Sequence, residues 1–391
     1  MKIAILGCRG VPGRYGGFET FSTELAPRLV ERGHNVTVYC NPRYCPSERP
    51  ADYRGVRLCY LPVPSWRTVE TPLHELRSLI DALHRDYDVL YVLAFRASLL
   101  YVLPRIAGRR IVFNTDGLDW KRSKWNWMAQ AYLKFSEAVG ARIAADALIA
   151  DSRGMQEYIR EAHGRESVFI PYGAPVVNSS RPELLRPYGL AARSYFLVVA
   201  RLEPENNVHV ALESFAHVSS DKPLVVVGGA NYRSEYHRRL ERLAGPGVLF
   251  TGPIYDPDVL NELWCNCYAY IHGHQVGGTN PSLLQAMGAG CCVLAHDVNF
   301  NREVVGDSGF YWQPTVDSLT RCLRDVLRCP EERLDLLRER ARETVRARYD
   351  WERVTADHET VFGHVCGACR AARRTPMIEE HPRPLHPPDH A

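Results

Sequence analysis

The chain has 391 residues, of which 46% are hydrophobic and 24% are charged, and its formal net charge is +3 at pH 7. This length exceeds what one hydrophobic core usually supports, and the composition is that of an ordinary globular protein, so two domains are expected. The small net charge argues against a nucleic-acid partner, and no run of about 18 uninterrupted apolar residues predicts a membrane-spanning helix.

The first residues, 1–6, are typical of a strand and carry no charged leader or cleavage site, which favours a cytoplasmic protein. Twelve cysteines are scattered through predicted strands and helices, and this distribution favours reduced, buried thiols. Cys366 and Cys369 form a C-x-x-C pattern, but no second pair stands at metal spacing and no strand precedes it. We therefore interpret the pattern as a chance pairing near a helix end.

Strand-like runs alternate with helical patterns from end to end, which predicts an α/β fold with parallel sheets. The predicted strands of the first half are residues 3–6, 36–39, 56–60, 89–92, 110–114, 147–150 and 168–170. Asp86 and Asp88 form a D-x-D pattern on the wrong edge of this sheet for a ligand, so a solvated turn is expected. Proline, glycine and small polar residues between 171 and 182 then predict an interdomain linker.

A long loop, residues 7–20, follows the first predicted strand and opens a helix. Its five glycines and two arginines exceed what a glycine-closed turn requires, which favours a ligand-binding role. The loop lacks the G-x-G-x-x-G spacing, and the second strand ends at Asn41 without an acidic residue for a ribose. A nicotinamide-dependent oxidoreductase is therefore disfavoured.

A second series of strands is predicted at 195–199, 224–227, 248–251, 267–271, 291–294 and 310–311. Apolar spacing and charge pairs predict helix over about 330–361, and the tail from 370 to 391 lacks periodicity and is expected to be disordered. The expected domains are therefore residues 1–178 and 179–350.

The segment from Gly277 to Gly290 is the most informative, because small residues run into a helix start at the C-terminal end of a predicted parallel strand. Glycine lets backbone N–H groups approach a ligand, and the first helical turn leaves its own N–H groups unpaired. A diphosphate fits such a site. Arg201, which follows the strand 195–199, would point its guanidinium at the same crevice, with a salt bridge to Glu203 or Glu205 as the alternative.

Four segments in order, 7–20, 114–122, 200–207 and 277–287, resemble GT-B glycosyltransferases of family 4. The N-terminal segments are similar to those of bacterial rhamnosyltransferases, with a domain of the DUF1972 type. The resemblance covers the chain to about residue 365. It implies two Rossmann-like domains facing each other across a cleft, with the nucleotide-sugar on the C-terminal domain and the acceptor on the N-terminal one. It also implies a closing helix, about 351–369, that packs back on the first domain, and no metal or other cofactor.

The resemblance assigns roles to particular residues. Arg201 would stabilise the leaving diphosphate, and Asp116 would contact the acceptor hydroxyl or the donor sugar or act as a base, with a helix cap as its alternative. Glu19 would orient substrate or merely offset the helix dipole. The donor-binding residues are Gly16, Gly17, Arg201, Asn206, Gly277, Gly278, Thr279, Asn280, Ser282 and Gln285. The acceptor-binding residues are Arg9, Arg14, Tyr15, Glu19, Lys121 and Arg122.

The chain departs from the family pattern at three of these positions. Asn206 replaces the usual lysine, and Gly277 and Gln285 replace a pair of glutamates that reach sugar and ribose hydroxyls. Loss of the first carboxylate suits a 6-deoxy sugar, and the amide of Gln285 can still hydrogen-bond a single ribose hydroxyl. These departures agree with dTDP-L-rhamnose as the donor.

The expected function is retaining transfer of L-rhamnose from dTDP-L-rhamnose to a glycan or polyprenyl-linked saccharide in cell-surface polysaccharide synthesis. Aromatic and basic residues alternate over 120–127, which suits contact with the inner face of the plasma membrane, with core packing of the tryptophans as the alternative. Two other functions stay open. One is a nucleotide-sugar epimerase or phosphorylase on the same fold, and the other is a non-catalytic nucleotide-sugar-binding subunit.

Overall fold

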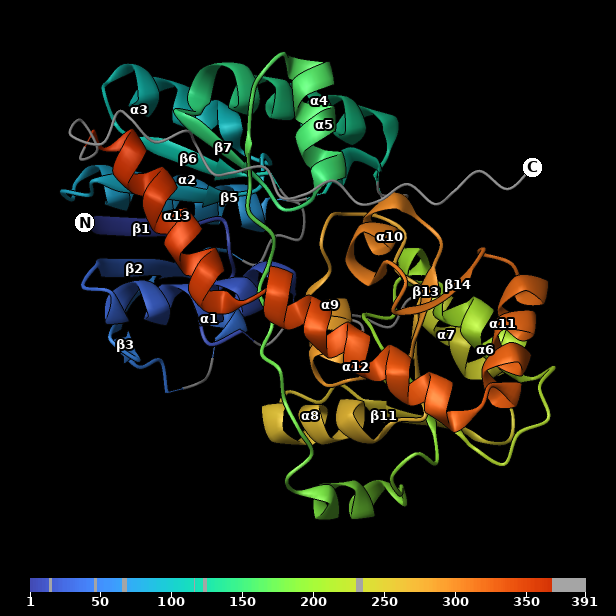
Figure 1. Ribbon diagram of the computed structural model, residues 1–391. Coiled ribbons are helices and arrows are strands. Elements are labelled where there is room, and N and C mark those ends of the chain that lie inside the picture. Colours follow the sequence, from blue (N-terminus) through green and yellow to red (C-terminus); the bar gives the residue numbers. More distant parts are fainter. Residues whose placement is uncertain are drawn as a thin grey trace.

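The computed structural model describes residues 1–13, 16–45, 48–64, 69–115, 117–121, 125–229 and 235–367. Within them the chain forms two α/β domains, each built on its own sheet, and the C-terminal helices cross from the second domain back to the first (Figure 1). The predicted fold class, two Rossmann-like domains, is confirmed. Predictions for Arg14, Tyr15, Asp116, Arg122 and the tail from 370 to 391 fall outside the described residues.

The N-terminal domain holds an eight-stranded sheet in the order β3-β4-β2-β1-β5-β6-β7-β8. The strands are β1 Lys2–Leu6, β2 Asn35–Cys40, β3 Asp52–Tyr53, β4 Val56–Tyr60, β5 Val89–Leu93, β6 Ile111–Asn114, β7 Ala147–Ala150 and β8 Val168–Phe169. The pairing is parallel except between β3 and β4. The strand β3 was not predicted, because two residues are too few to show an alternating pattern.

Helices and short helical turns cover this sheet. The α-helices are α1 Gly17–Glu31, α2 Glu70–Leu83, α3 Val102–Ile106, α4 Trp127–Val139 and α5 Arg153–His163. The short turns are η1 Pro42–Tyr44, η2 Ser98–Tyr101, η3 Asp119–Lys121 and the π-helical η4 Gly140–Ala144. Asp86 is exposed and pairs with Lys2 (2.9 Å), and Asp88 accepts a hydrogen bond from the Lys2 backbone, as expected for a surface turn.

The C-terminal domain holds a six-stranded parallel sheet in the order β11-β10-β9-β12-β13-β14. Its strands are β9 Phe196–Val199, β10 Leu224–Val227, β11 Val248–Gly252, β12 Ala269–His272, β13 Val293–His296 and β14 Gly309–Trp312. The helical segments are η5 Pro182–Tyr188, η6 Pro204–Asn206, α6 Val208–Phe215, α7 Glu235–Leu243, α8 Pro257–Asn266, α9 Pro281–Gly288, α10 Asn299–Val305, α11 Val316–Arg328 and α12 Glu331–Arg348.

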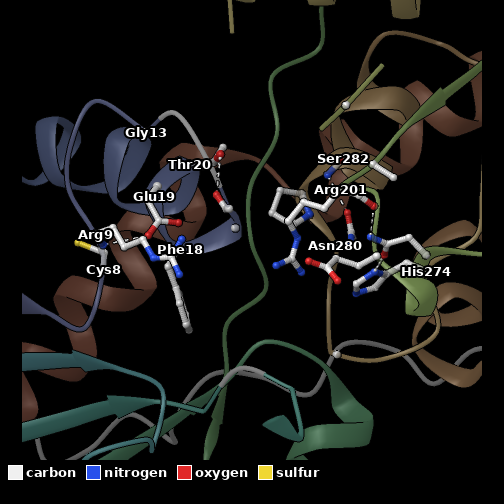
Figure 2. A pocket seen from close by; sticks show the side chains of 18 of the residues that line it. Cys8, Arg9, Gly13, Phe18, Glu19, Thr20, Arg201, His274, Asn280 and Ser282 are labelled. Carbon is white, nitrogen blue, oxygen red and sulfur yellow. Dashed lines mark hydrogen bonds between the residues drawn. The ribbon is translucent and has the colours of Figure 1, made fainter. Parts of the chain in front are cut away.

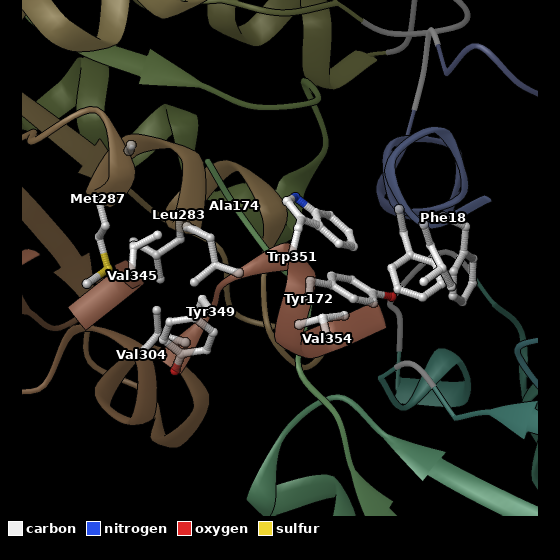
Figure 3. Close-up of a cluster of buried hydrophobic side chains, with 14 of the residues drawn as sticks. Phe18, Tyr172, Ala174, Leu283, Met287, Val304, Val345, Tyr349, Trp351 and Val354 are labelled. Carbon is white, nitrogen blue, oxygen red and sulfur yellow. The ribbon is translucent and has the colours of Figure 1, made fainter. Parts of the chain in front are cut away.

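The last helix, α13 Trp351–Val365, packs against α1 of the first domain. Tyr349 and Asp350 separate it from α12, and Asp350 caps it, because the Asp350 side chain accepts a hydrogen bond from the backbone of Arg353. Arg32, which directly follows α1, donates to Glu352 (2.9 Å) and Glu359 (3.3 Å) of α13. Trp351 lies among buried side chains from both domains, beside Tyr172 of the linker (Figure 3). Burial of these apolar surfaces stabilises the relative placement of the domains.

A buried polar network also fastens α13 to the first sheet. Asn114 donates to the hydroxyl of Tyr91 (3.0 Å), that hydroxyl bonds His358 Nε2 (2.9 Å), and His358 Nδ1 bonds the carbonyl of Val354 (2.7 Å). Burial lowers the pKa of His358 to about 4. Each polar group in this hydrogen-bond network therefore has a partner when the imidazole is neutral. None of the helices in the described ranges has the length and apolarity needed to cross a membrane.

Candidate functional site

A cavity of about 1430 Å³ lies between the two domains and is lined by both. All the predicted donor-binding residues line it, as do two of the predicted acceptor-binding residues: Gly16, Gly17, Arg201, Asn206, Gly277, Gly278, Thr279, Asn280, Ser282, Gln285, Arg9 and Glu19. Figure 2 shows side chains of the two domains on opposite sides of this space. We call the two sides the N-terminal face and the C-terminal face.

Two helix N-termini converge on the cavity. Helix α1 begins at Gly17 after Gly16, whose φ of +118° is open to glycine and strained for other residues. Helix α9 begins at Pro281, and its cap Asn280 accepts a hydrogen bond from the Ser282 backbone (2.9 Å). The two starts are close, since a methyl group on Gly17 would lie 3.7 Å from Pro281 Cγ. The positive ends of both helix dipoles therefore favour an anion in the space beside them.

The glycine loop before α9 is held against the first domain. A methyl group on Gly278 would lie 2.0 Å from Asp151 Oδ1, and one on Gly117 would lie 2.1 Å from Gly277 Cα. The hydroxyl of Thr279 donates to the carbonyl of Asp151. In the described part of the chain, no protein acceptor takes a hydrogen bond from the backbone N–H groups of residues 277–279. These amides are thus available to a ligand.

Arg201 follows β9 and lines the C-terminal face (Figure 2). The alternative expected for it, a salt bridge to Glu203 or Glu205, is not formed among the described residues. A guanidinium at the end of a parallel strand, beside a helix N-terminus, suits bidentate binding of phosphate oxygens.

Asn206 lines the cavity, but its side chain is engaged by the protein. Its amide nitrogen donates to the carbonyl of Arg201 (2.7 Å), and its oxygen lies 2.6 Å from Nδ1 of His274. Because that oxygen can only accept, Nδ1 carries the proton. The Nε2 atom of His274 then lies 3.2 Å from where a methyl group on Gly277 would stand. The imidazole of His274 therefore borders position 277, where the family pattern has a glutamate. The sequence did not indicate this placement of His274.

On the N-terminal face, Glu19 is buried and accepts a hydrogen bond from the backbone of Arg9 (2.9 Å). Burial raises the pKa of Glu19 above its usual range, while that hydrogen bond and the Arg9 charge act against the rise. The Arg9 guanidinium lies 4.6 Å from the centre of the Tyr44 ring. Glu19 therefore closes the loop over the start of α1 and presents its carboxylate to the cavity.

Helix α2 brings an ionisable cluster that sequence reasoning missed. Six residues form the buried side of this helix. Three of them, Glu70, His74 and Glu75, line the cavity, and the other three are Ser78, Leu79 and Ala82. Glu70 accepts from Asn41 Nδ2 (3.0 Å), and burial lowers the pKa of His74. A signal was present, because three ionisable residues occupy positions that helical spacing turns inward.

Glu75 is the most unusual member of that cluster. Its side chain is buried, with 4% of its surface exposed, and it forms no hydrogen bond or ion pair in the described ranges. Burial raises the pKa of Glu75 to about 7, and the nearby Arg96 charge acts against the rise. Arg96 itself pairs with Asp119 (2.5 Å). An unpartnered buried carboxyl at a cavity wall is costly without a ligand, so it marks a candidate functional group.

His272 of β12 is a second buried group without a partner at one of its atoms. Its Nδ1 lies 3.2 Å from the hydroxyl of Tyr270, whereas Nε2 has no hydrogen-bond partner in the part of the chain that the structure describes. Burial lowers the pKa of His272 to about 3. His272 therefore enters the cavity wall as a neutral ring.

The aromatic segment lies only partly at the cavity. Lys121 does not line the cavity; it is exposed, with its ammonium 5.4 Å from the centre of the Trp120 ring. Trp120 and Trp125 are half-buried and Trp125 lines the cavity, while Trp127 is exposed. Alternation of residue types did not predict these orientations, because a 3-10 turn and a helix start interrupt the segment. The described residues contain no group of three or more His, Cys, Asp or Glu placed to hold a metal ion.

Two family models match the chain. Residues 1–175 match the domain of unknown function DUF1972, and residues 181–344 match the family "Glycosyl transferases group 1". The phosphatidyl-myo-inositol mannosyltransferase of Mycolicibacterium smegmatis is 26% identical over 372 residues, which cover 90% of this chain and 91% of the relative. The O-antigen chain mannosyltransferase C of Escherichia coli is 23% identical over 258 residues, covering 63% of this chain and 66% of the relative.

Solved structures share the fold at low sequence identity. Sucrose-phosphate synthase from Thermosynechococcus elongatus superimposes with a TM-score of 0.80 at 17% identity, covering 94% of this chain and 99% of the other. HepE of Anabaena in complex with UDP superimposes with a TM-score of 0.72 at 20% identity, covering 93% of this chain and all of the other. These likenesses establish the GT-B arrangement of two domains about a cleft.

Proposed function

Because this chain is a glycosyltransferase of the GT-B type, in which a DUF1972 domain precedes a glycosyl transferases group 1 domain, we propose that it transfers a hexose from a nucleoside diphosphate to a carbohydrate hydroxyl. One observation carries the proposal. The N-termini of α1 and α9, the backbone amides of residues 277–279 and the guanidinium of Arg201 all border the same cavity. This set of positive groups fits a diphosphate.

The chemistry follows from that placement. The bond between the anomeric carbon and the phosphate oxygen breaks, and the acceptor hydroxyl forms the new glycosidic bond. Charge that develops on the departing diphosphate is met by Arg201 and the backbone amides, which is the main source of rate enhancement. The hydroxyl proton passes to the departing phosphate on the same face of the sugar, with Asp116 as the competing base. Such same-face attack retains the anomeric configuration.

We propose L-rhamnose, carried by dTDP, as the first candidate sugar. Gly277 supplies no carboxylate for a hexose hydroxyl, and His274 borders that position instead. Gln285, which also lines the cavity, keeps an amide for one ribose hydroxyl. Mannose is the second candidate, because the curated relatives named above are mannosyltransferases.

We place the acceptor, a glycan or a polyprenyl-linked saccharide, on the N-terminal face. The carboxyl groups of Glu19 and Glu75 border the cavity there, and carboxylates accept hydrogen bonds from sugar hydroxyls. A lipid-linked acceptor would require contact with the inner surface of the membrane. One relative is named as a phosphatidyl-myo-inositol mannosyltransferase, and this name supports an acceptor that is itself a lipid.

Thermal unfolding in the presence of a nucleotide-sugar panel tests the donor. A donor at about 100 times its dissociation constant adds about 2.7 kcal/mol to the folded state, and we expect dTDP-L-rhamnose to stabilise the chain more than GDP-mannose or UDP-glucose. Preference for another donor removes the rhamnose assignment. Transfer to a saccharide acceptor, with the product's anomeric configuration read by NMR, then tests the reaction; inversion contradicts the retaining mechanism.

The same assays separate the other two functions. Turnover of the nucleotide-sugar without a carbohydrate acceptor would indicate an epimerase or a phosphorylase. Tight binding of a donor with no turnover under any acceptor would indicate a non-catalytic subunit.

A further inference from the structure

One side of the N-terminal domain carries most of the exposed apolar side chains. Of the thirteen large hydrophobic residues exposed in the described ranges, eight belong to η2, α3, α4 and η4. We call these eight residues the apolar face: Leu99, Leu103, Ile106, Trp127, Met128, Tyr132, Phe135 and Ile143. Leu103 and Trp127 are each 76% exposed, and Phe135 is 59% exposed. A contiguous set of such side chains in solvent is typical of an interaction surface.

Helical spacing makes the face continuous. On α4 the exposed positions Trp127, Met128 and Phe135 lie on one side, while Leu133 and Glu137 are buried on the other. Helix α4 contacts η2, and α3 contacts η4, so the exposed apolar residues of α4 and η4 adjoin those of η2 and α3. Figure 1 shows α3 and α4 along the same outer edge of the domain.

The exposed charges beside this face are positive, and the nearby Asp146 carboxylate is largely buried and paired with Arg105 (3.0 Å). Lys121, Lys134 and Arg142 are exposed beside it, and none of them pairs with a carboxylate among the described residues. The stretches 98–110 and 125–145 contain a single acidic residue, Glu137. Glu137 is buried and accepts a hydrogen bond from the hydroxyl of Tyr158 (2.6 Å). The face is therefore apolar and positively charged.

We propose that the apolar face binds the surface of an anionic lipid bilayer. Exposed tryptophan, phenylalanine and leucine enter the boundary between headgroups and acyl chains, and lysine and arginine beside them contact anionic headgroups. A second copy of the chain is a poorer partner, because a two-fold interface through this face would bring like charges together.

The placement of α4 connects this surface to the cavity. Trp125, Ala129 and Leu133 line the cavity, and Tyr132, which belongs to the apolar face, lines it as well. The Tyr132 hydroxyl donates to the carbonyl of Arg96 (3.1 Å), which fixes the helix at the rim. Bilayer binding thus brings the acceptor side of the cavity to the membrane. This consequence rests on the proposed function, whereas the binding itself does not.

Vesicle sedimentation with the full-length chain, without nucleotide-sugar or acceptor, tests the proposal. We expect binding to vesicles of phosphatidylcholine with phosphatidylglycerol, weaker binding to phosphatidylcholine alone, and weakening by salt. The double variant Trp127→Ser, Phe135→Ser should bind at least about tenfold more weakly, because two large side chains no longer leave water. The double variant Lys134→Gln, Arg142→Gln should lose the preference for anionic vesicles.

Leu336→Ser, at an exposed leucine of α12 away from this face, is the matched control and should bind as the parent chain does. Unfolding temperatures confirm that all the variants fold. Absence of binding of the parent chain to anionic vesicles overturns the proposal, as does equal binding by Trp127→Ser, Phe135→Ser. A dimer in sedimentation velocity that this variant abolishes would overturn it too, since the face would then join two copies. The donor site can fail or succeed independently of all these outcomes.

Discussion

The two faces of the cavity are built from different material. The C-terminal face presents backbone amides of residues 277–279, the start of α9 and one guanidinium, all at the ends of adjacent strands. The N-terminal face presents carboxyl groups and aromatic rings from α1, α2, η1 and α4. A face of amides suits the fixed geometry of a diphosphate, whereas a face of side chains can change its specificity by substitution without a change of fold.

The largest effect is expected at the only arginine on the C-terminal face within the described residues. Arg201→Ala removes a preorganised cation from the leaving group, so turnover should fall about a thousandfold, which corresponds to roughly 4 kcal/mol. Arg201→Lys keeps the charge but loses the planar fork and should recover only part of the activity. Steady-state transfer rates and donor titrations measure both. Normal donor binding by Arg201→Ala would show that the diphosphate lies elsewhere, and Arg321→Ala on the exposed side of α11 is the control.

The next effect tests the N-terminal face. Since the pKa of Glu75 is raised in the folded state to about 7, the folded chain binds a proton that the unfolded chain releases, and stability falls as pH rises from about 4.5 through 7. Glu75→Gln removes this dependence, so its gain over the parent chain should grow between pH 5 and pH 8 by on the order of 3 kcal/mol. Urea unfolding at the two pH values measures the difference.

Glu70→Gln is the matched control for that measurement. It removes the charge that pairs with Arg43 (3.5 Å), while its amide oxygen can still accept from Asn41, so its effect on stability should be small and the same at both pH values. A constant difference between Glu75→Gln and the parent chain across pH would contradict the burial of an unpartnered carboxyl.

A smaller effect is expected where the glycine loop meets the first domain. Gly278→Ala places a methyl group against the buried Asp151 carboxylate and should destabilise the chain by about 2 kcal/mol, because the fully buried side chain has little room to move. Gly363→Ala in α13, where no atom lies within 4 Å of the new methyl group, should be neutral or stabilising. Thermal unfolding of both variants measures the two changes in stability. Equal stabilities of the two variants would mean that the loop moves away from Asp151.

The smallest effect concerns the link between two loops of the C-terminal face. Asn206→Ala loses the bonds to the Arg201 carbonyl and to His274, so donor affinity should fall about tenfold, near 1.4 kcal/mol. Asn206→Asp keeps the acceptor for His274 and should fall less. Donor affinity unchanged in both variants would show that the amide does not orient Arg201.

The fold was largely predictable, because most strands have four or more residues and can be recognised from the composition and spacing of their apolar residues. The strand β3 was not found, since it depends on two residues only. The sequence also predicted that residues between Gly277 and Ser282, together with Arg201, lie at the C-terminal face. Lys121, which was predicted to bind the acceptor, lies outside the cavity lining, because the direction of a side chain in a short turn is set by what packs beneath it.

The sequence by itself determined the anion-binding loops, because glycines, a helix cap and a helix start are consecutive residues whose conformation is local. Only the tertiary structure decided which side chains stand opposite those loops. Glu75 reaches the cavity because the crossover from β4 to β5 lays α2 along the sheet, and Asn206 meets His274 because β9 and β12 are neighbours. Contacts of this kind join residues far apart in the chain, and their positions follow from sheet order rather than from any nearby pattern.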